Sequence, residues 1–376
     1  ERLEQMICRF TEEQFDALDL LDENDRVVFK GPAGTGKTFL AMEAAKRAIA
    51  DGQSVLFLCY NNLLGEWLKT QTSGYSDDPG VFQCRTFHSL LLEIAGEKPG
   101  KGAGSTYWRK DLPVRASDRL LDDARPWPAY DMLVIDEAQD LLEEEYLDVF
   151  DLLLKGGLAG GKWVFFGDFE RQAIYVSDGG AGAQQALEGI SDRAPRHVKF
   201  SLRINCRNAE PIAETLAITS GLAPGYKRVL HDIEGSEVDP LFYSSAADQE
   251  MHLANAIGNL KKAFKAGEIM ILSMRSDESS CAGSASAGSI GVRLAPIRQV
   301  QDGQTIPYAS VHAFKGLEAP AVIITDIDSL NDERTRALLY VGMSRARIRL
   351  FMLMHESCRA SYDRILDAGL EMTSRK

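Results

Sequence analysis

The chain has 376 residues, of which 45% are hydrophobic and 26% are charged, and its formal net charge at pH 7 is −13. This length is enough for two domains of ordinary size, each with its own core. The negative charge argues against a broad basic surface for nucleic acid, although a local track of a few cations is enough to bind phosphates.

The sequence contains neither the run of roughly twenty apolar residues that a membrane-spanning helix needs nor a secretory signal. We therefore expect a cytoplasmic protein without a membrane partner. The six cysteines include no C-x-x-C pair, which argues against a zinc site or a disulfide framework and fits a reducing compartment. Because the chain begins with Glu1 rather than Met, we expect it to be part of a longer polypeptide.

The first element expected along the chain is a helix that begins after Thr11. Thr-x-x-Gln precedes an apolar helical pattern here and is a capping box, in which each side chain bonds the other residue's backbone N–H. Gln14 could instead present its carboxamide to the edge of an adenine. The residues alone leave both interpretations open.

The next expected element is a strand at residues 26–30, and a glycine-rich loop follows it at residues 31–38. It reads GPAGTGKT, matches G-x-x-x-x-G-K-[ST], and precedes an amphipathic helical pattern at 39–46. Such a loop points backbone N–H groups and the positive end of the helix dipole at phosphate oxygens. Lys37 is placed to reach the β- and γ-phosphates, and Thr38 to ligate Mg²⁺. The loop predicts a nucleoside triphosphate site formed by Gly31, Pro32, Ala33, Gly34, Thr35, Gly36, Lys37 and Thr38.

Further strands are expected to alternate with helices up to about residue 200, at 55–58, 132–135 and 163–166. A second round is expected to begin near 198–200 and to continue at 268–272, 321–325 and 349–353. This alternation predicts an α/β fold with parallel sheets. We expect a first domain at 1–200, with a short insertion near 92–130, and a second domain at 201–376.

Two segments rich in Gly, Ser and Ala, 96–105 and 276–291, are expected to be loops or mobile insertions.

An acidic motif, Val134-Ile-Asp-Glu-Ala-Gln-Asp140, follows the strand expected at 132–135. A carboxylate at a strand end can hold Mg²⁺ through water, which suits Asp136. Glu137 is then the candidate general base for the water that attacks the γ-phosphorus. An acidic cap at a helix N-terminus is the alternative interpretation. Combined with the glycine-rich loop, the motif favours hydrolysis over simple binding.

Gln172 lies in the segment Gly167–Tyr175, after the strand expected at 163–166. A glutamine at a strand end can hydrogen-bond a γ-phosphate and convey its loss to a neighbouring surface. The alternative is an ordinary polar loop residue.

Taken together, these motifs resemble those of superfamily 1 helicases of the UvrD/Rep/PcrA type. Leu202-Arg-Ile-Asn-Cys-Arg-Asn208 resembles L-x-x-N-Y-R-S, and the segment 310–318 resembles T-x-H-x-x-K-G-L-E. The segment 336–346 resembles R-x-L-x-Y-V-x-x-T-R-A. The motifs occur in family order from about residue 11 to 352, so the resemblance covers nearly the whole chain.

The resemblance implies two tandem RecA-like domains that bind ATP with Mg²⁺. It makes Arg207 and Arg345 cations for the γ-phosphate, Glu318 an acceptor for the ribose hydroxyl, and Gln14 the reader of adenine. The catalytic set expected on this basis is Lys37, Asp136, Glu137, Gln172, Arg207 and Arg345.

The resemblance also implies contacts with a nucleic-acid strand, single-stranded DNA or, as the alternative, RNA. Aromatic rings can stack on bases without sequence preference. Tyr60 is the candidate for stacking, although a buried core aromatic is the alternative. The strand contacts expected are Tyr60, Asn61, Thr86, Phe87, His88, Tyr175 and His312.

The sequence departs from the family pattern at several positions. Cys206 replaces the usual Tyr that stacks on adenine, and Ser177 replaces a strand-stacking Trp. One extra residue separates Asp168 from Gln172, and both accessory insertions are much reduced. What remains resembles a bare motor core, including those fused to nuclease-related domains.

Two functional hypotheses follow. The first is an ATP-dependent DNA translocase or helicase, moving 3′ to 5′ as its relatives do. The second is a nucleic-acid-stimulated ATPase switch that controls a fused or partner nuclease without appreciable unwinding. A small-molecule kinase would not need the segments that carry Arg207 and Arg345.

Overall fold

The computed structural model describes residues 11–98, 103–122, 127–169, 180–220, 225–285 and 290–374. Its contacts divide the chain into two compact units. The first comprises the residues up to Pro32 together with Gly36–Leu202, and the second comprises Ala33–Thr35 together with Arg203–Lys376. Among the described residues, no helix has the length and apolar character to span a lipid bilayer.

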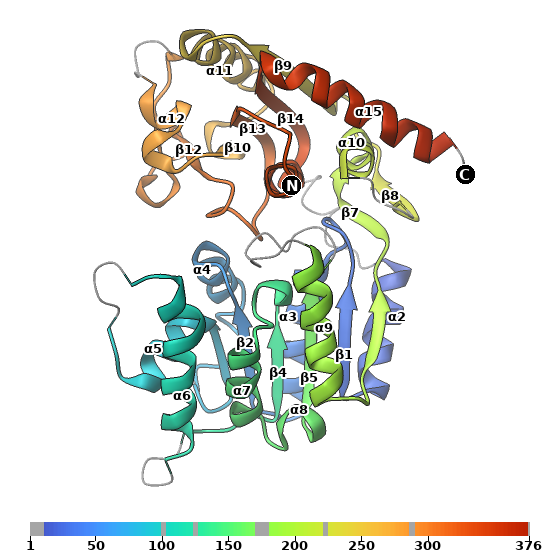
Figure 1. Cartoon of the computed structure of the whole chain (residues 1–376), viewed down its shortest axis with the longest axis vertical. Coiled ribbons are helices and arrows are strands. Elements are labelled where there is room, and N and C mark those ends of the chain that lie inside the picture. The colour runs from blue at the N-terminus through green and yellow to red at the C-terminus, as the bar shows by residue number, and fades with distance from the viewer. Residues whose placement is uncertain are drawn as a thin grey trace. The chain divides into compact units, whose positions relative to one another are not determined.

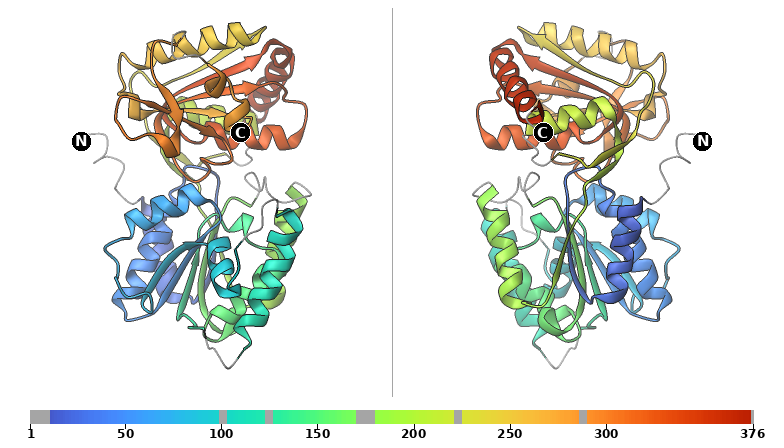
Figure 2. Two further views of the ribbon diagram at one scale, coloured as in Figure 1. Left: turned by 90° about the vertical axis from the view of Figure 1, so that its left-hand side faces the viewer. Right: turned by 90° about the vertical axis from the view of Figure 1, so that its right-hand side faces the viewer.

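Within its described residues, the first unit is built on a six-stranded sheet in the order β3-β2-β4-β5-β1-β6, and every strand pair is parallel. Helices cover both faces, with α2 and α3 on one side and α5, α6, α7 and α9 on the other (Figures 1 and 2). The strands are β1 (Arg26–Lys30), β2 (Val55–Cys59), β3 (Phe82–Thr86), β4 (Met132–Ile135), β5 (Lys162–Gly167) and β6 (Val198–Ser201). The helices are α2 (Glu12–Glu23), α3 (Lys37–Ala50), α4 (Asn62–Gln71), α5 (Phe87–Ala95), α6 (Leu112–Leu120), α7 (Glu144–Leu153), α8 (Gly157–Gly160) and α9 (Gly180–Arg193).

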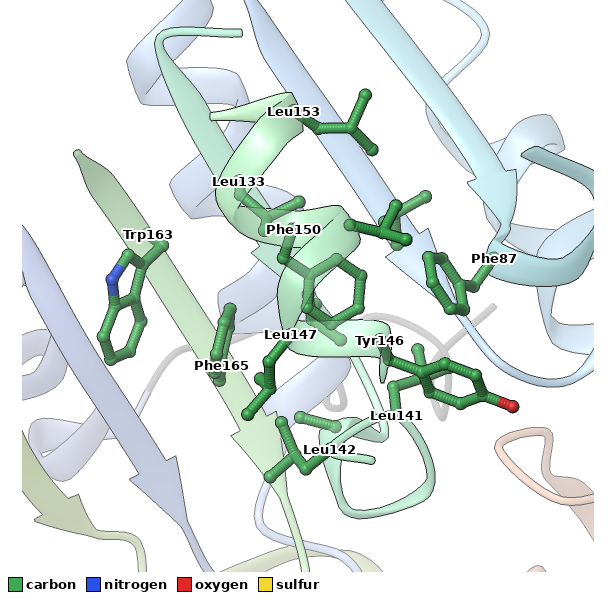
Figure 3. Packing of buried hydrophobic residues seen from close by; sticks show 14 of the residues in the cluster. Phe87, Leu133, Leu141, Leu142, Tyr146, Leu147, Phe150, Leu153, Trp163 and Phe165 are labelled. Carbon is green, nitrogen blue, oxygen red and sulfur yellow. The ribbon is translucent and has the colours of Figure 1, made fainter. Parts of the chain in front are cut away.

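The main core of this unit lies between the sheet and α5, α6 and α7. Phe87, Phe150 and Phe165 are fully buried there, together with Tyr146 and Leu147 (Figure 3). A π-helical turn, η1 (Tyr107–Asp111), leads into α6. Within its described residues, the segment between α5 and β4 therefore contributes η1 and α6 to the cover of one sheet face.

The second unit has a six-stranded parallel sheet in the order β11-β12-β10-β13-β14-β9 and a two-stranded sheet of β7 and β8, within its described residues. Helix α11 packs on one face of the larger sheet, and α14 lies on the other (Figure 2). The strands are β7 (Ile204–Ala209), β8 (Arg228–His231), β9 (Glu237–Tyr243), β10 (Ile269–Ser273), β11 (Leu294–Pro296), β12 (Ile306–Ser310), β13 (Ala319–Ile327) and β14 (Ala346–His355). The helices are α10 (Glu210–Ser220), α11 (Ala246–Leu260), α12 (Cys281–Ser284), α14 (Glu333–Met343) and α15 (Arg359–Ser374).

These two parallel α/β units confirm the expected fold class, and two details of the expectation are wrong. Strand β6 pairs with β1 in the first sheet, so the second round does not begin at 198–200. The segment 276–291 is not only loop, because it holds the 3₁₀ turn Asp277–Ser279 and the short helix α12, whose Ala282 is buried. Such short helices have no apolar periodicity for sequence analysis to detect.

Candidate active site

The glycine-rich loop connects the end of β1 to the start of α3, which begins at Lys37, two residues before the expected position. Gly34 and Gly36 have φ angles of 83° and 78°, in the left-handed region that glycine adopts without steric cost. Gly36 is also the N-cap of α3 and provides no side chain for its first N–H groups. Backbone N–H groups at the start of a helix have no intrahelical acceptor and can bind an anion.

The side chain of Lys37 lies folded against this loop. Its Nζ donates hydrogen bonds to the carbonyl oxygens of Gly31, at 2.8 Å, and Pro32, at 3.0 Å. The residue is only 7% exposed. The loop thus holds the ammonium group beside the backbone N–H groups expected to receive the phosphates.

Asp136 immediately follows β4 and is 1% exposed. Its Oδ1 accepts a hydrogen bond from the backbone N–H of Glu137 at 3.0 Å, whereas its buried Oδ2 has no hydrogen-bond partner among the described residues. Burial, and then the neighbouring charge of Glu137, raise the pKa of Asp136 to about 6. The Thr38 hydroxyl and the Lys37 ammonium offset part of this rise in pKa, although neither donates to Oδ2.

An unpartnered carboxylate oxygen close to a threonine hydroxyl suits a hard cation, because Mg²⁺ prefers oxygen ligands and keeps several of its waters. The described residues contain no group of three or more His, Cys, Asp or Glu that could hold a metal. The arrangement of Thr38 and Asp136 therefore fits a metal held largely by water and phosphate oxygens.

Glu137 has a left-handed backbone, with φ 54° and ψ 41°, which is uncommon for a residue with a side chain. Its Oε2 accepts a hydrogen bond from Nε2 of Gln139 at 2.6 Å. The other end of that carboxamide, Oε1, accepts from the backbone N–H of Asp168 at 3.1 Å. Gln139 was not among the expected site residues, although it lies within the acidic motif itself.

Thr11 and Gln14 form the expected capping box at the start of α2. The backbone N–H of Thr11 donates to Oε1 of Gln14 at 2.8 Å, and the backbone N–H of Gln14 donates to the Thr11 hydroxyl at 3.1 Å. The capping interpretation is thus confirmed, and the carboxamide is held in place at the first turn of the helix. A role for Gln14 in reading adenine stays a prediction.

In the second unit, Arg207 and Glu318 form an ion pair. Nε of Arg207 donates to Oε2 of Glu318 at 2.5 Å, and Arg347 lies 3.7 Å from the other carboxylate oxygen. The expected γ-phosphate cation and the expected ribose acceptor therefore contact each other. Cys206, which replaces the family's Tyr, lies next to them in β7.

Arg345 is almost fully buried. Its guanidinium donates to the carbonyl oxygens of Val341 and Leu317 and to the hydroxyl of Ser344. These bonds fix the guanidinium at the end of α14.

Aromatic rings gather around His88 in the first unit. Its ring centroid lies 5.2 Å from that of Tyr60 and 5.3 Å from that of Trp108, and its Nε2 is 3.3 Å from the hydroxyl of Tyr146. Burial lowers the pKa of His88 to about 4, so the ring is neutral at physiological pH. Tyr60 is partly buried against the core. This position is intermediate between a stacking surface for bases and a core aromatic, the two interpretations of Tyr60. Trp108 belongs to η1 and was not expected at this site.

The remaining expected strand contacts have different surroundings. Phe87 is fully buried between Tyr146 and Phe150, so its ring has no face for a base (Figure 3).

Asn61 caps α4 through its side chain, and Thr86 is 8% exposed. His312 is half-buried, and burial followed by the charges of Arg334 and Lys315 lowers its pKa. Gln172 and Tyr175 lie outside the described residues.

Comparison with known families agrees with these motifs. The model of an AAA domain matches residues 9–221, more than half of the chain, and the model of the UvrD-like helicase C-terminal domain matches residues 308–353. A comparison with curated proteins gave no match. With two parallel α/β units, a phosphate loop and these two family matches, the chain belongs to the nucleotide-binding UvrD/Rep-like superfamily 1 helicases.

Proposed function

We propose that the chain hydrolyses ATP with Mg²⁺ and uses the energy to move along single-stranded DNA in the 3′ to 5′ direction. The observation that carries the proposal is the buried pair Asp136 and Glu137 beside Thr38 and Lys37, with one carboxylate oxygen left without a partner. Such a pair has the chemistry for holding a cation and for accepting a proton.

In the proposed reaction, Glu137 accepts a proton from the attacking water. A bond forms between the water oxygen and the γ-phosphorus, and the bond from that phosphorus to the β,γ-bridging oxygen breaks to release ADP. Lys37 and the loop N–H groups bind the phosphate oxygens, and bound Mg²⁺ would neutralise part of their charge. Thr38 and Asp136 are the residues that would hold the cation.

The residues of the second unit enter the proposal through the family motifs. Arg207 and Arg345 stabilise the charge that develops on the γ-phosphate, as planar guanidinium groups do in other phosphoryl transfers. Glu318 accepts from the ribose hydroxyl. Glu318 is paired with Arg207 in the structure, and its carboxylate has further lone pairs with which to accept from the ribose hydroxyl.

For the strand, we propose stacking on the aromatic group of Tyr60, His88 and Trp108, with contacts from Asn61, Thr86, Tyr175 and His312. Phe87 is left out because it is fully buried. Since Ser177 stands where the family has a stacking Trp, Trp108 offers an indole from a different segment.

A second candidate function is an ATPase switch that controls a fused or partner nuclease. The reduced insertion, which contributes only η1 and α6 between α5 and β4 within the described residues, favours it because little remains there to separate a duplex.

Turnover of ATP with and without single-stranded DNA, measured alongside displacement of a strand from a 3′-tailed duplex, separates the two. Stimulated turnover with displacement supports a helicase, and stimulated turnover without displacement supports the switch. Single-stranded RNA in the same assay tests the nucleic-acid preference. Turnover that ignores both nucleic acids contradicts both candidates.

Replacing Trp108 tests the stacking surface. The affinity for oligo-dT should fall by about tenfold in Trp108→Ala, since stacking on one base contributes about 1–3 kcal/mol. Trp108→Phe keeps an aromatic face and should retain most of the affinity. Equal affinities of the parent and Trp108→Ala, measured by fluorescence anisotropy, would exclude Trp108 from the surface.

A further inference from the structure

Gln139 connects the proposed base to the end of β5. It is 1% exposed, and its carboxamide spans from the carboxylate of Glu137, at 2.6 Å, to the backbone N–H of Asp168, at 3.1 Å. We propose that Gln139 is a positioning residue for hydrolysis, which aims the Glu137 carboxylate and ties it to the residue that follows β5. The inference rests on the proposed function of Glu137.

The orientation of the carboxamide follows from its partners. A backbone N–H can only donate, so the atom that faces Asp168 must be the oxygen. The amide nitrogen must then face Glu137, whose carboxylate accepts. Each end of Gln139 therefore meets the group that it requires, and rotating the carboxamide by half a turn would lose both bonds.

The backbone at both anchor points is specialised for this contact. A Cβ on Gly167 would lie 2.6 Å from Oε1 of Gln139 and 2.7 Å from the ring of Phe169, so β5 must end in glycine for the carboxamide to approach. Glu137 adopts φ 54°, a left-handed conformation that is unfavourable in a residue with a side chain. Strain of this kind persists where surrounding contacts hold it, and the bond to Gln139 is one such contact.

A carboxylate held on one side by a donor has fewer orientations than a free one. Fewer orientations then have to be lost when the carboxylate accepts a proton during the reaction. A residue that acts in this way changes the rate of hydrolysis but not the binding of ATP. A residue needed only for packing changes the stability and the binding together.

The test compares Gln139→Met with the full-length parent and with Gln71→Met, an exposed control on α4. Methionine matches the length of glutamine but donates and accepts no strong hydrogen bond. We expect kcat to fall by about 100-fold, within the range that a positioned base contributes, with the KM for ATP within about threefold of the parent. A kcat within threefold of the parent, or a KM that rises as far as kcat falls, would overturn the proposal.

A pair of further variants tests the hydrogen bond without measuring turnover. Gln139→Glu keeps the acceptor for Asp168 but places a second carboxylate against Glu137, so its melting temperature should fall. The double variant Glu137→Gln and Gln139→Glu exchanges donor and acceptor and should recover that loss while remaining inactive. A double variant no more stable than Gln139→Glu would show that the two side chains are not paired. If the parent itself lacks ATP turnover, the proposed function fails, while the stability comparison still decides the pairing.

Discussion

Each of the two six-stranded sheets has a buried aspartate near the carboxyl end of a central strand. The two aspartates differ in how many hydrogen bonds their carboxylates accept. Asp136 follows β4 in the first unit and Asp326 lies near the end of β13 in the second, and both are buried. An acidic residue with positive φ occurs at each place, Glu137 at 54° and Asp326 at 62°. The carboxylate of Asp326 accepts from the Ser273 hydroxyl at 2.7 Å, the Thr325 hydroxyl at 2.8 Å and the backbone N–H of Cys281.

Oδ2 of Asp136, in contrast, has no partner among the described residues. Buried polar groups in native proteins are nearly always hydrogen-bonded, so an exception needs a reason such as an ion. In the first sheet, where the phosphate loop is adjacent, the proposed cation would partner this oxygen. In the second sheet, hydroxyl groups donate to the carboxylate of Asp326, and these hydrogen bonds contribute to stability. On the proposed function, the same architecture serves binding in one unit and folding in the other.

The largest effect is expected at the residues of the first unit that we propose act on the nucleotide. Glu137→Gln should lower ATP turnover by on the order of 10³-fold while ATP still binds, because the proton acceptor is lost. Lys37→Ala should lower turnover as far and also weaken ATP binding, because phosphate contacts are lost. Lys46→Ala, an exposed lysine on the same helix α3, is the control. Turnover that survives in both active-site variants would remove this sheet edge from the reaction.

Replacing the two aspartates should have different effects on the free energy of unfolding. Asp326→Asn should lower the free energy of unfolding by about 2–3 kcal/mol, since the new NH₂ group faces donors and bonds to a charged acceptor are lost. Asparagine tolerates positive φ, so this variant tests the hydrogen bonds and not the backbone. Asp136→Asn should not destabilise the protein and should weaken Mg²⁺-dependent ATP binding.

Urea unfolding followed by circular dichroism measures these changes. Tryptophan fluorescence reports the first unit alone, because Trp67, Trp108, Trp127 and Trp163 all belong to it. A loss of stability as large in Asp136→Asn as in Asp326→Asn would mean that the two sheet edges are satisfied in the same way.

The contribution of Asp136 to stability should fall as pH rises, which is the opposite of what a carboxyl group with a lowered pKa would give. Its pKa is raised from 3.8 to about 6 in the folded protein, so between these values the folded state binds more protons than the unfolded state. The contribution of Asp136 to stability therefore falls as pH rises from about 4 to 6 and stays at its lower level above 6. One pKa unit corresponds to about 1.4 kcal/mol, so the fall should be on the order of 1–3 kcal/mol.

The measurement is the difference in unfolding free energy between the parent and Asp136→Asn across this range, without nucleotide or Mg²⁺. Subtracting the variant removes the titration of other carboxylates. If this difference in unfolding free energy did not vary with pH, burial would not raise the pKa of Asp136.

The sequence predicted those features of the two sheets that depend on neighbouring residues in the chain, such as the bounds of single strands. Strands β1 and β4 were predicted at their observed bounds, because each is a short apolar run next to a glycine-rich or acidic segment. Strand β9 was not predicted. It contains Pro240 and lies at the edge of its sheet, where a missing N–H is tolerated but the apolar pattern is weak.

The contacts that distinguish the two sheet edges could not be predicted, because they join residues far apart in the chain. Ser273 and Asp326 are 53 residues apart, and Gln139 and Asp168 are 29 apart. Gln139 was visible in the acidic motif, but nothing local showed which backbone N–H it meets. Phe87 shows the reverse case, since a family motif suggested a strand contact and the packing of α5 places its ring in the core.

The smallest expected effect comes from the hydroxyl groups near the two aspartates. Ser273→Ala removes one of the donors to Asp326, and we expect a loss of about 1–2 kcal/mol in unfolding free energy, since a bond to a charged acceptor is lost while others remain. ATP turnover should not change. Thr38→Ala should have the reverse profile, with little loss of stability and weaker Mg²⁺-dependent ATP binding, because we propose that the Thr38 hydroxyl ligates the cation. If Thr38→Ala were the less stable of the two and still bound Mg²⁺-ATP normally, its hydroxyl would serve folding as that of Ser273 does, and the contrast between the two sheets would be lost.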